Sequence, residues 1–347
     1  MSTPSDELPG SPDAIALPLL GKLPSISVIL PVLNEQVHLR EAIEAILMQD
    51  YAGAFEIILA LGPSRDNTNT IAHELARNSS KIVLVDSPTG RTAVGLNVAI
   101  SKSDNPVIVR VDGHANIPTN YLSLVVEILN ATGAVNVGGV MAALGATPFE
   151  DAVAAAMRSP LGVGASRFHT GGRAAAVDTV YLGAFRREAL LAVGGFDERF
   201  TRAQDWELNY RLRANGGIVY FDPRLHVTYR PRPTLKALAK QYFEYGRWRR
   251  VVSRRHIGTI NYRYLAPPLA LAGTALSLFW GLLVAPIFLL PAIIYAAFVF
   301  IASIFIASSP IEYFRLLAIV PTMHFSWGLG FLTSPKSLVP TSPHVHA

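Results

Sequence analysis

The strongest constraint on this chain is a run of 48 residues, 264–311, that contains no Asp, Glu, Lys, Arg or His. As a helix rising about 1.5 Å per residue, the run would measure roughly 72 Å, whereas one crossing of a bilayer core needs about 30 Å. It is therefore long enough for about two crossings, and Pro286 is the expected turn between spans at 266–285 and 287–308. A buried soluble hairpin is the alternative, but soluble helices of that length normally carry a polar stripe.

A third apolar segment follows at 314–333 and is interrupted by Pro321 and His324. We expect it to complete a membrane region over 264–333, either by spanning or by lying re-entrant or at the interface. Of the 347 residues, half are hydrophobic and only 16% are charged, which is too apolar for an ordinary soluble or disordered protein. The absence of cysteine excludes disulfides and thiolate sites, so any metal must bind oxygen or imidazole ligands.

Positive charge is concentrated in the segment just before the apolar run. The basic residues there are Lys236, Lys240, Arg247, Arg249, Arg250, Arg254 and Arg255. With Glu244 as the one acidic residue, the segment 234–260 predicts an amphipathic helix at the membrane interface, with membrane lipids as partners. A nucleic-acid partner is not expected, because such proteins spread their basic residues over a surface. By the positive-inside rule, the segment and everything before it lie in the cytoplasm of a multi-pass protein of the plasma (inner) membrane.

Gln241, Arg247 and Trp248 resemble the Q-x-x-R-W signature of processive polysaccharide synthases, although Arg247 comes six positions after Gln241 instead of three. A polymer-binding role is therefore an alternative to the interfacial helix. Residues 1–24 contain five prolines and early acidic residues, and we expect a flexible tail there without a secretion signal. Residues 334–347 form the expected C-terminal tail.

Apolar runs and helical patterns alternate four times before the membrane segment. Apolar runs at 26–30, 56–61, 81–85 and 106–111 predict strands, and helices are expected at 68–78, at 93–101 and after Asn34, where Val37, Ile43, Ile46 and Leu47 would form the apolar face. Because the strand runs are apolar throughout, we expect an α/β fold over 25–233, with a mostly parallel sheet covered by helices on both faces. No Walker-type or G-x-G-x-x-G motif follows a strand, which argues against P-loop NTPases and Rossmann oxidoreductases.

Polar residues follow these strands at their carboxyl ends. Ligands of parallel sheets bind beyond those ends, so Asn34, the loop 62–66 and Asp112-Gly113-His114 are expected on one rim. Asp112 and His114 are two residues apart, so both side chains leave an extended chain on the same side. A carboxylate with an imidazole suits Mn²⁺ or Mg²⁺ when diphosphate oxygens complete the shell. The alternative is that Asp112 caps the next turn and His114 is a surface residue.

Six segments come in the order, and at about the intervals, of family 2 glycosyltransferases. They are SISVILPVLNE, EIILALGPSRDNT, GRTAVGLNVAI, VRVDGHA, YLGAFRREALLAVGGFDERF and QDWELNYRLR. The chain resembles that family from Ser25 to about Arg213 and, with its membrane segment, is most similar to the ExoA-like subgroup of succinoglycan biosynthesis. The resemblance implies a GT-A fold with a metal-bound nucleotide sugar as donor. A UDP-hexose is the expected donor, and a GDP-sugar is the alternative.

The resemblance implies roles for individual residues. Asp112 and His114 take the place of the family's D-x-D motif as ligands of a divalent cation, Mn²⁺ or Mg²⁺, and His226 is a candidate third ligand. Asp205 would be the catalytic base that accepts the proton of the acceptor hydroxyl in an inverting transfer. The implied donor-binding residues are Pro31, Asn34, Glu35, Gly62, Asp66, Arg91, Asn97 and Asp112, and the implied acceptor-binding residues are Gly195, Phe196, Asp197, Gln204 and Trp206.

Some of these assignments have structural alternatives. From the residues alone, Asp205 is equally interpreted as the N-cap of a helix over 206–215, and His226 as part of a surface strand. The chain also departs from the family pattern, because Leu61-Gly62 stand where most members have paired aspartates. The expected carboxylate contact to the nucleotide base is therefore missing.

The function implied is a membrane-anchored inverting glycosyltransferase that transfers a hexose from a nucleotide sugar to a lipid-linked or glycan acceptor. Its product would enter cell-surface polysaccharide or glycolipid synthesis. A polyprenyl-phosphate sugar synthase is one alternative. The other is a non-catalytic membrane scaffold with the same fold, which the missing aspartate pair favours and the presence of Asp112, His114 and Asp205 disfavours.

Overall fold

A computed structural model describes residues 17–339. Of the tails expected at 1–24 and 334–347, residues 1–16 and 340–347 therefore lie outside the described residues. By its internal contacts the chain forms two units. The first contains Gly171–Thr228 and the residues up to Met141, and the second contains Ala142–Thr170 and the residues from Tyr229 onward. We expected the segment 142–170 within the catalytic domain. By its contacts it belongs to the second unit, which also contains the apolar C-terminal helices.

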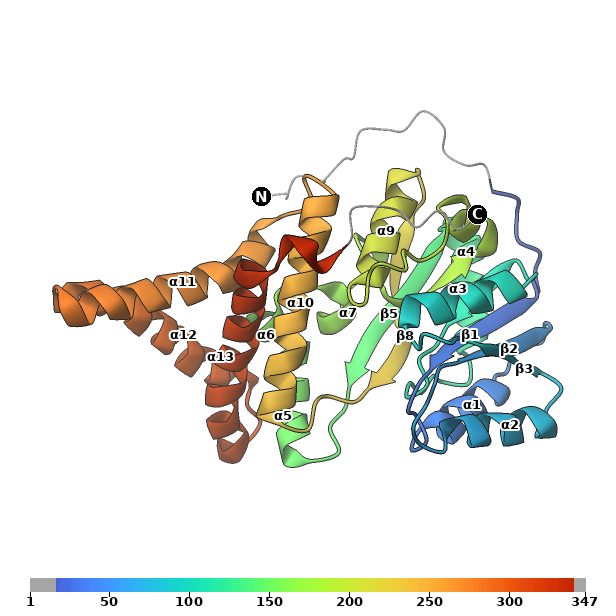
Figure 1. The fold of residues 1–347 in the computed structure, drawn as a ribbon, viewed down its shortest axis with the longest axis horizontal. Coiled ribbons are helices and arrows are strands. Elements are labelled where there is room, and N and C mark those ends of the chain that lie inside the picture. The colour runs from blue at the N-terminus through green and yellow to red at the C-terminus, as the bar shows by residue number, and fades with distance from the viewer. Residues whose placement is uncertain (1–16, 340–347) are drawn as a thin grey trace. The chain divides into compact units, whose positions relative to one another are not determined.

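The described residues contain an eight-stranded sheet with the order β3-β2-β1-β4-β7-β5-β8-β6 (Figure 1). The strands are β1 (Ile26–Val32), β2 (Phe55–Leu61), β3 (Ile82–Asp86), β4 (Val107–Arg110), β5 (Asn136–Ala143), β6 (Ala175–Ala176), β7 (Tyr181–Arg186) and β8 (Val219–Tyr229). β1 pairs in parallel with β2 and β4, and β2 with β3. β7 runs antiparallel to β4 and β5, and β6 to β8. The predicted α/β fold is confirmed, with an antiparallel half that the sequence patterns did not indicate.

Helices cover both faces of the sheet. α1 (Leu39–Leu47), α2 (Thr68–Asn78) and α4 (Tyr121–Thr132) pack into one hydrophobic cluster, and α3 (Thr92–Lys102), α8 (Arg187–Ala192) and α9 (Gln204–Ala214) pack into the other. β1 contributes to both clusters, with Val28 and Leu30 on one face and Ile29 on the other. This follows from the alternation of side chains along a strand and explains why the strand is apolar throughout.

The first helix begins later than its pattern predicted. Asn34 adopts a left-handed conformation with φ 57°, and the chain turns through the following residues before α1 starts at Leu39. Val37 was therefore wrongly placed on the apolar face, and its side chain is 75% exposed. Ile43 and Ile46 are buried as expected.

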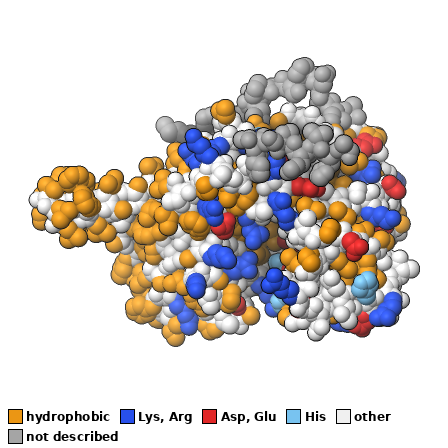
Figure 2. All heavy atoms as spheres, in the orientation of Figure 1, with side chains coloured by type: hydrophobic (Ala, Val, Ile, Leu, Met, Phe, Trp, Pro, Cys, Tyr) orange, Lys and Arg blue, Asp and Glu red, His pale blue; other side chains and the backbone are white. Residues whose placement is uncertain are grey.

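The second unit is helical. Its helices are α5 (Pro148–Arg158), α6 (Pro160–Val163), α7 (Arg167–Thr170), α10 (Leu235–Arg255), α11 (Tyr262–Leu283), α12 (Leu290–Ile306) and α13 (Pro310–Thr333), with 3₁₀ turns at Pro286–Leu289 and Lys336–Leu338. α11, the segment Pro286–Ile306 and α13 are each long and apolar enough to cross a membrane. Pro321 lies inside α13 without interrupting it. On the face seen in Figure 2, the projecting part of α11 and α12 carries hydrophobic side chains and no charged ones.

The basic helix α10 packs closely along α13. A Cβ atom added at Gly246 of α10 would lie 1.9 Å from the carbonyl oxygen of Trp327, and one added at Gly330 of α13 would lie 2.0 Å from that of Phe243. Backbones approach this closely only where side chains are absent. One face of the predicted interfacial helix is therefore covered by protein.

We predict that Gly246→Ala lowers stability, because its methyl group would force α10 and α13 apart at a cost of about 1–3 kcal/mol. Gly273→Ala in α11 is the matched control, since a Cβ there meets nothing within 4 Å and alanine favours a helix by about 1 kcal/mol over glycine. Thermal unfolding of the detergent-solubilised protein should show a lower Tm for Gly246→Ala alone. Equal Tm values for the two variants would contradict the close approach of the helices.

Candidate active site

A buried arginine connects two of the carboxylates expected at the site. Arg110 is the last residue of β4, and its side chain is 4% exposed. Its Nε and Nη2 donate to Oδ1 of Asp112 at 3.2 and 3.0 Å, and its Nη1 donates to Oδ1 of Asp205. Asp112 and Asp205 are 93 positions apart in the sequence, so the fold brings the expected metal ligand and the expected base to one guanidinium.

The three charges perturb one another. Burial lowers the pKa of Arg110, but the charges of Asp112 and Asp205 outweigh this effect and raise it above its ordinary value. Burial raises the pKa of Asp205 to about 6, and the charge of Asp112 adds to this effect while Arg110 opposes it. A carboxyl group with a pKa near the working pH is suited to general-base catalysis.

Helix α9 holds Asp205 in place. The N-cap position is Ala203, which has a left-handed φ of 58°, and Asp205 is the second residue of the helix. The interpretation of Asp205 as an N-cap is therefore wrong. One turn later, Asn209 accepts from Nδ2 of Asn136 at 2.6 Å and donates to Oγ1 of Thr179 at 2.9 Å. These buried bonds anchor the helix to the sheet and fix the direction from which the carboxylate approaches Arg110.

His114 is oriented by a carboxylate. Its Nδ1 lies 2.8 Å from Oε1 of Glu35, so the carboxylate of Glu35 accepts a hydrogen bond from the imidazole. Glu35 is one of the residues expected to bind the nucleotide-sugar donor. With the proton on Nδ1, the lone pair is on Nε2, which is the arrangement usual for a metal-ligating histidine with a carboxylate partner. A Cβ at Gly113 would lie 3.0 Å from Cγ of Glu35, so a residue without a side chain allows this approach.

The side chains of Asp112 and His114 fit a divalent cation that is held by few protein ligands. Across residues 17–339 no group of three or more Asp, Glu or His side chains is placed to hold a metal ion, so His226 does not join Asp112 and His114. His226 is exposed on β8, where its Nδ1 lies 3.2 Å from the carbonyl oxygen of Arg224. One carboxylate and one imidazole suit Mn²⁺ or Mg²⁺ when substrate phosphates and water supply the remaining ligands.

The loops after β1 and β2 are bound to each other. Oδ1 of Asn34 accepts from the backbone N–H of Arg65 at 2.8 Å, and Asp66 accepts from Oγ1 of Thr68 at 2.5 Å. The bond from Thr68 holds the pKa of Asp66 below its ordinary value. The backbone N–H of Gly62 donates to Val32 at 2.8 Å, and Pro31 pairs with Ala60 inside the sheet. The expected donor-binding residues of these loops thus form one ordered surface at the carboxyl ends of the strands.

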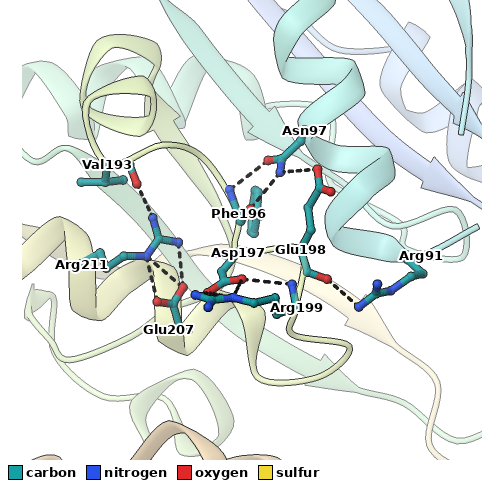
Figure 3. A network of polar contacts seen from close by, with 9 residues as sticks. All are labelled: Arg91, Asn97, Val193, Phe196, Asp197, Glu198, Arg199, Glu207 and Arg211. Carbon is teal, nitrogen blue, oxygen red and sulfur yellow. Dashed lines mark hydrogen bonds and ion pairs between the residues drawn. The ribbon is translucent and has the colours of Figure 1, made fainter. Parts of the chain in front are cut away.

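The loop after α8 is fixed by residues that we expected to bind the donor (Figure 3). Asn97 accepts from the backbone N–H of Phe196 at 2.9 Å and donates to Phe196 O at 2.8 Å and to Oε1 of Glu198 at 3.0 Å. Arg91 donates to the carbonyl oxygen of Glu198. Gly195 has a φ of 67°, and a Cβ there would lie 2.7 Å from Oδ1 of Asn97. Asn97 therefore acts on the backbone of the expected acceptor loop.

The expected acceptor residues differ in exposure. Phe196 is 2% exposed and packs edge-to-face with Phe185, so it anchors the loop from within. Arg199 binds both carboxylate oxygens of Asp197; although burial raises the pKa of Asp197, these bonds lower it overall. Gln204 is buried, and the ring of Trp206 stacks on that of Tyr210.

The sequence analysis did not identify Arg110, Glu198 or Arg199 as parts of the site. A signal for Arg110 was present, because a charged residue in the apolar run PVIVRV must find a partner when the strand is buried. No comparable signal marked Glu198, which accepts from Arg91 through its carbonyl oxygen and from Asn97 through its carboxylate. Its neighbour Arg199 pairs with Asp197 two residues away, a spacing common on any surface.

Comparison with known proteins identifies the class to which this fold and site belong. The family described as "Glycosyl transferase family 2" matches residues 27–194. A relative is also 31% identical over 311 residues, which cover 88% of this chain and 93% of the relative. The chain belongs to glycosyltransferase family 2.

That relative is the succinoglycan biosynthesis protein ExoA of Rhizobium meliloti (strain 1021). A Methanococcus voltae dolichyl N-acetyl-alpha-D-glucosaminyl phosphate 3-beta-D-2,3-diacetamido-2,3-dideoxy-beta-D-glucuronosyltransferase is 24% identical, over 70% of this chain and 77% of the relative. Among solved structures, the mannosyltransferase PcManGT of Pyrobaculum calidifontis, in complex with GDP-Man and Mn²⁺, superposes with a TM-score of 0.64 at 20% identity, covering 89% of this chain and 87% of that one. TarS 1–349 of S. aureus with UDP reaches 0.51 at 15% identity, covering 86% and 89%. The structural likenesses confirm the GT-A fold.

We predict that Arg110→Gln moves the acidic limb of the pH profile of kcat/KM to higher pH. Arg110 lowers the pKa of Asp205, so its loss raises that pKa above about 6, and a smaller fraction of the base is ionised at neutral pH. Arg110→Lys keeps the charge and should shift the limb less. An unchanged limb in Arg110→Gln would show that Asp205 does not control the rate.

Proposed function

We propose that the chain is a membrane-anchored inverting glycosyltransferase that transfers a hexose from a nucleotide diphosphate sugar to a lipid-linked or glycan acceptor in cell-surface polysaccharide synthesis. The observation that carries this proposal is the shared contact of Asp112 and Asp205 with the buried Arg110. It brings together the group expected to hold the donor's cation and the group expected to accept the acceptor's proton. The similarity to a succinoglycan biosynthesis protein supports the polysaccharide assignment.

In the proposed reaction, Asp205 accepts the proton of the acceptor hydroxyl while the anomeric carbon is attacked from the face opposite the nucleotide. With a pKa of about 6, the carboxylate is largely ionised at neutral pH. Asp112 and His114 would hold the divalent cation, which would supply positive charge to neutralise the departing nucleoside diphosphate. Arg110 binds both carboxylates through its guanidinium, and Glu35 accepts from the imidazole and so orients it.

For the donor we propose a UDP-hexose, with a GDP-sugar as the alternative. Proteins of the same fold have been solved with GDP-Man and Mn²⁺ and with UDP, so the fold accepts both bases. Leu61-Gly62 replace the aspartate pair expected beside the base, and recognition of the base must then come from other groups. This departure also favours a non-catalytic scaffold as the second candidate function.

A donor panel with the purified protein separates the enzyme from the scaffold. We expect release of the nucleotide from one donor in the presence of Mn²⁺ or Mg²⁺, and none in excess chelator. Asp112→Asn should abolish release by removing a ligand charge, and His114→Ala should weaken it less completely. Asp104→Asn is the control, because this acid of the same unit is fully exposed. Full activity of Asp112→Asn would exclude the metal assignment, and no release from any donor would support the scaffold.

We predict that Asp205→Asn separates catalysis from donor binding. Asparagine keeps the size of the side chain and a hydrogen bond from Arg110 but cannot accept the proton, so transfer should fall by about 10² to 10⁴-fold. Donor and metal affinity should remain near those of the unmodified protein. Both quantities are measured on the same preparation, by product formation and by titration with the donor. Near-normal transfer would remove Asp205 from the mechanism and direct attention to Glu207 or Asp197.

A further inference from the structure

The three apolar helices of the second unit differ in what surrounds them. In α11 and in Pro286–Ile306, 17% of the most apolar window is buried, whereas the corresponding share for α13 is 39%. Large side chains such as Leu282 and Phe305 are more than three-quarters exposed on α11 and α12. An exposed apolar surface of this extent is typical of a segment in contact with a membrane or with another protein. α13 has less of this surface, because protein covers more of it.

Besides α11 and α12, two charged helices, α10 and α5, pack against α13. Ser334, which follows the end of α13, is bound twice to α10. Its Oγ donates to the carbonyl oxygen of Arg247 at 3.0 Å, and its own carbonyl oxygen accepts from Arg254 at 2.9 Å. Near its other end, Arg315 of α13 donates to the carbonyl oxygen of Pro148 in α5 at 2.9 Å. α10 contains seven basic residues, and α5 contains Glu150 and Asp151 in its first turn. If α13 crossed a bilayer, both neighbours would carry charges into the hydrocarbon, which is strongly unfavourable.

Arginine and aromatic side chains form a cluster near the start of α11, at the end of the α11–α12 hairpin opposite its turn. The guanidinium of Arg249 lies 3.7 Å from the ring centroid of Tyr264, which stacks on Trp327, and that of Arg250 lies 5.0 Å from the ring of Phe331. Trp and Tyr rings gather at the level of lipid headgroups. Arg249 is buried, whereas the partly exposed Arg250 can reach phosphates there.

The far end of the hairpin carries a second aromatic group. Trp280 and Phe288 are about half exposed beside the turn between α11 and α12. Trp280 comes 16 residues after Tyr264, which corresponds to about 24 Å of helix. That separation approaches the thickness of a bilayer core, about 30 Å. Figure 1 shows the hairpin projecting from the paired helices α10 and α13 in a direction different from theirs.

We propose that, among residues 17–339, only α11 and α12 cross the bilayer, and that α13 lies with α10 at the membrane surface on the side of the basic segment. The inference rests on the proposed membrane attachment and adds to it an even number of crossings. The lipid surface is then the partner of the α10–α13 pair, and the residues before α11 and after α13 share one side.

The chain contains no cysteine, so single introduced cysteines report topology without background. Three exposed positions suffice: Val284→Cys at the turn of the hairpin, Ser308→Cys before α13 and Lys336→Cys after it. Each variant is labelled with a membrane-impermeant maleimide in intact cells and again after permeabilisation. We expect Val284→Cys to react in intact cells, and Ser308→Cys and Lys336→Cys to react only after permeabilisation.

Two patterns would overturn the inference. If Lys336→Cys reacts in intact cells and Ser308→Cys does not, α13 crosses as a third span. If Val284→Cys reacts only after permeabilisation, as Ser308→Cys does, or reacts under neither condition, the hairpin does not cross the membrane. Retention in membranes after an alkaline carbonate wash is measured in parallel. Loss of the protein in that wash would refute membrane attachment itself, whereas a wrong labelling pattern in retained protein refutes the topology alone.

Discussion

The burial of one guanidinium at the end of β4 determines much of this site. A buried charge is tolerated only with charged or hydrogen-bonding partners, and Arg110 finds its partners in Asp112, two residues along the same chain segment, and Asp205, on a helix of distant sequence. The pairing ties the sheet to α9. It also brings the carboxylate proposed to hold the cation and the carboxylate proposed to accept the proton to one guanidinium. Burial raises the pKa of Asp205 to about 6, although the charge of Arg110 opposes this rise.

The surroundings of this cluster show that rigidity comes from residues one step removed from the chemistry. Glu35 orients His114, and Asn209 anchors the helix that carries Asp205. Asn97 holds the backbone of the loop at Gly195. Such second contacts keep a reacting group within the narrow range of positions that catalysis requires. Several residues expected to touch the donor, such as Glu35 and Asn97, make contacts of this kind within the protein.

In the second unit, the same sequence property has two structural outcomes. Three segments are apolar enough to cross a membrane, yet α13 is packed along α10 through Gly246 and Gly330. Hydropathy averages over a segment and does not record which face is covered by protein. Glycine in an apolar helix is equally compatible with an open position, as at Gly273, and with backbone contact, as at Gly330.

The amino-acid sequence was sufficient to predict the α/β fold, the positions of its first four strands within one or two residues, the apolar C-terminal helices and the family. These follow from periodicity, from apolar length and from motifs in order, all of which are local or linear properties. The tertiary structure alone decided the antiparallel half of the sheet, the start of α1 after the left-handed Asn34 and the pairing of Arg110 with Asp205. These features depend on which distant segments of the chain come into contact. A sequence pattern indicates that a buried charge needs a partner, but it does not identify that partner.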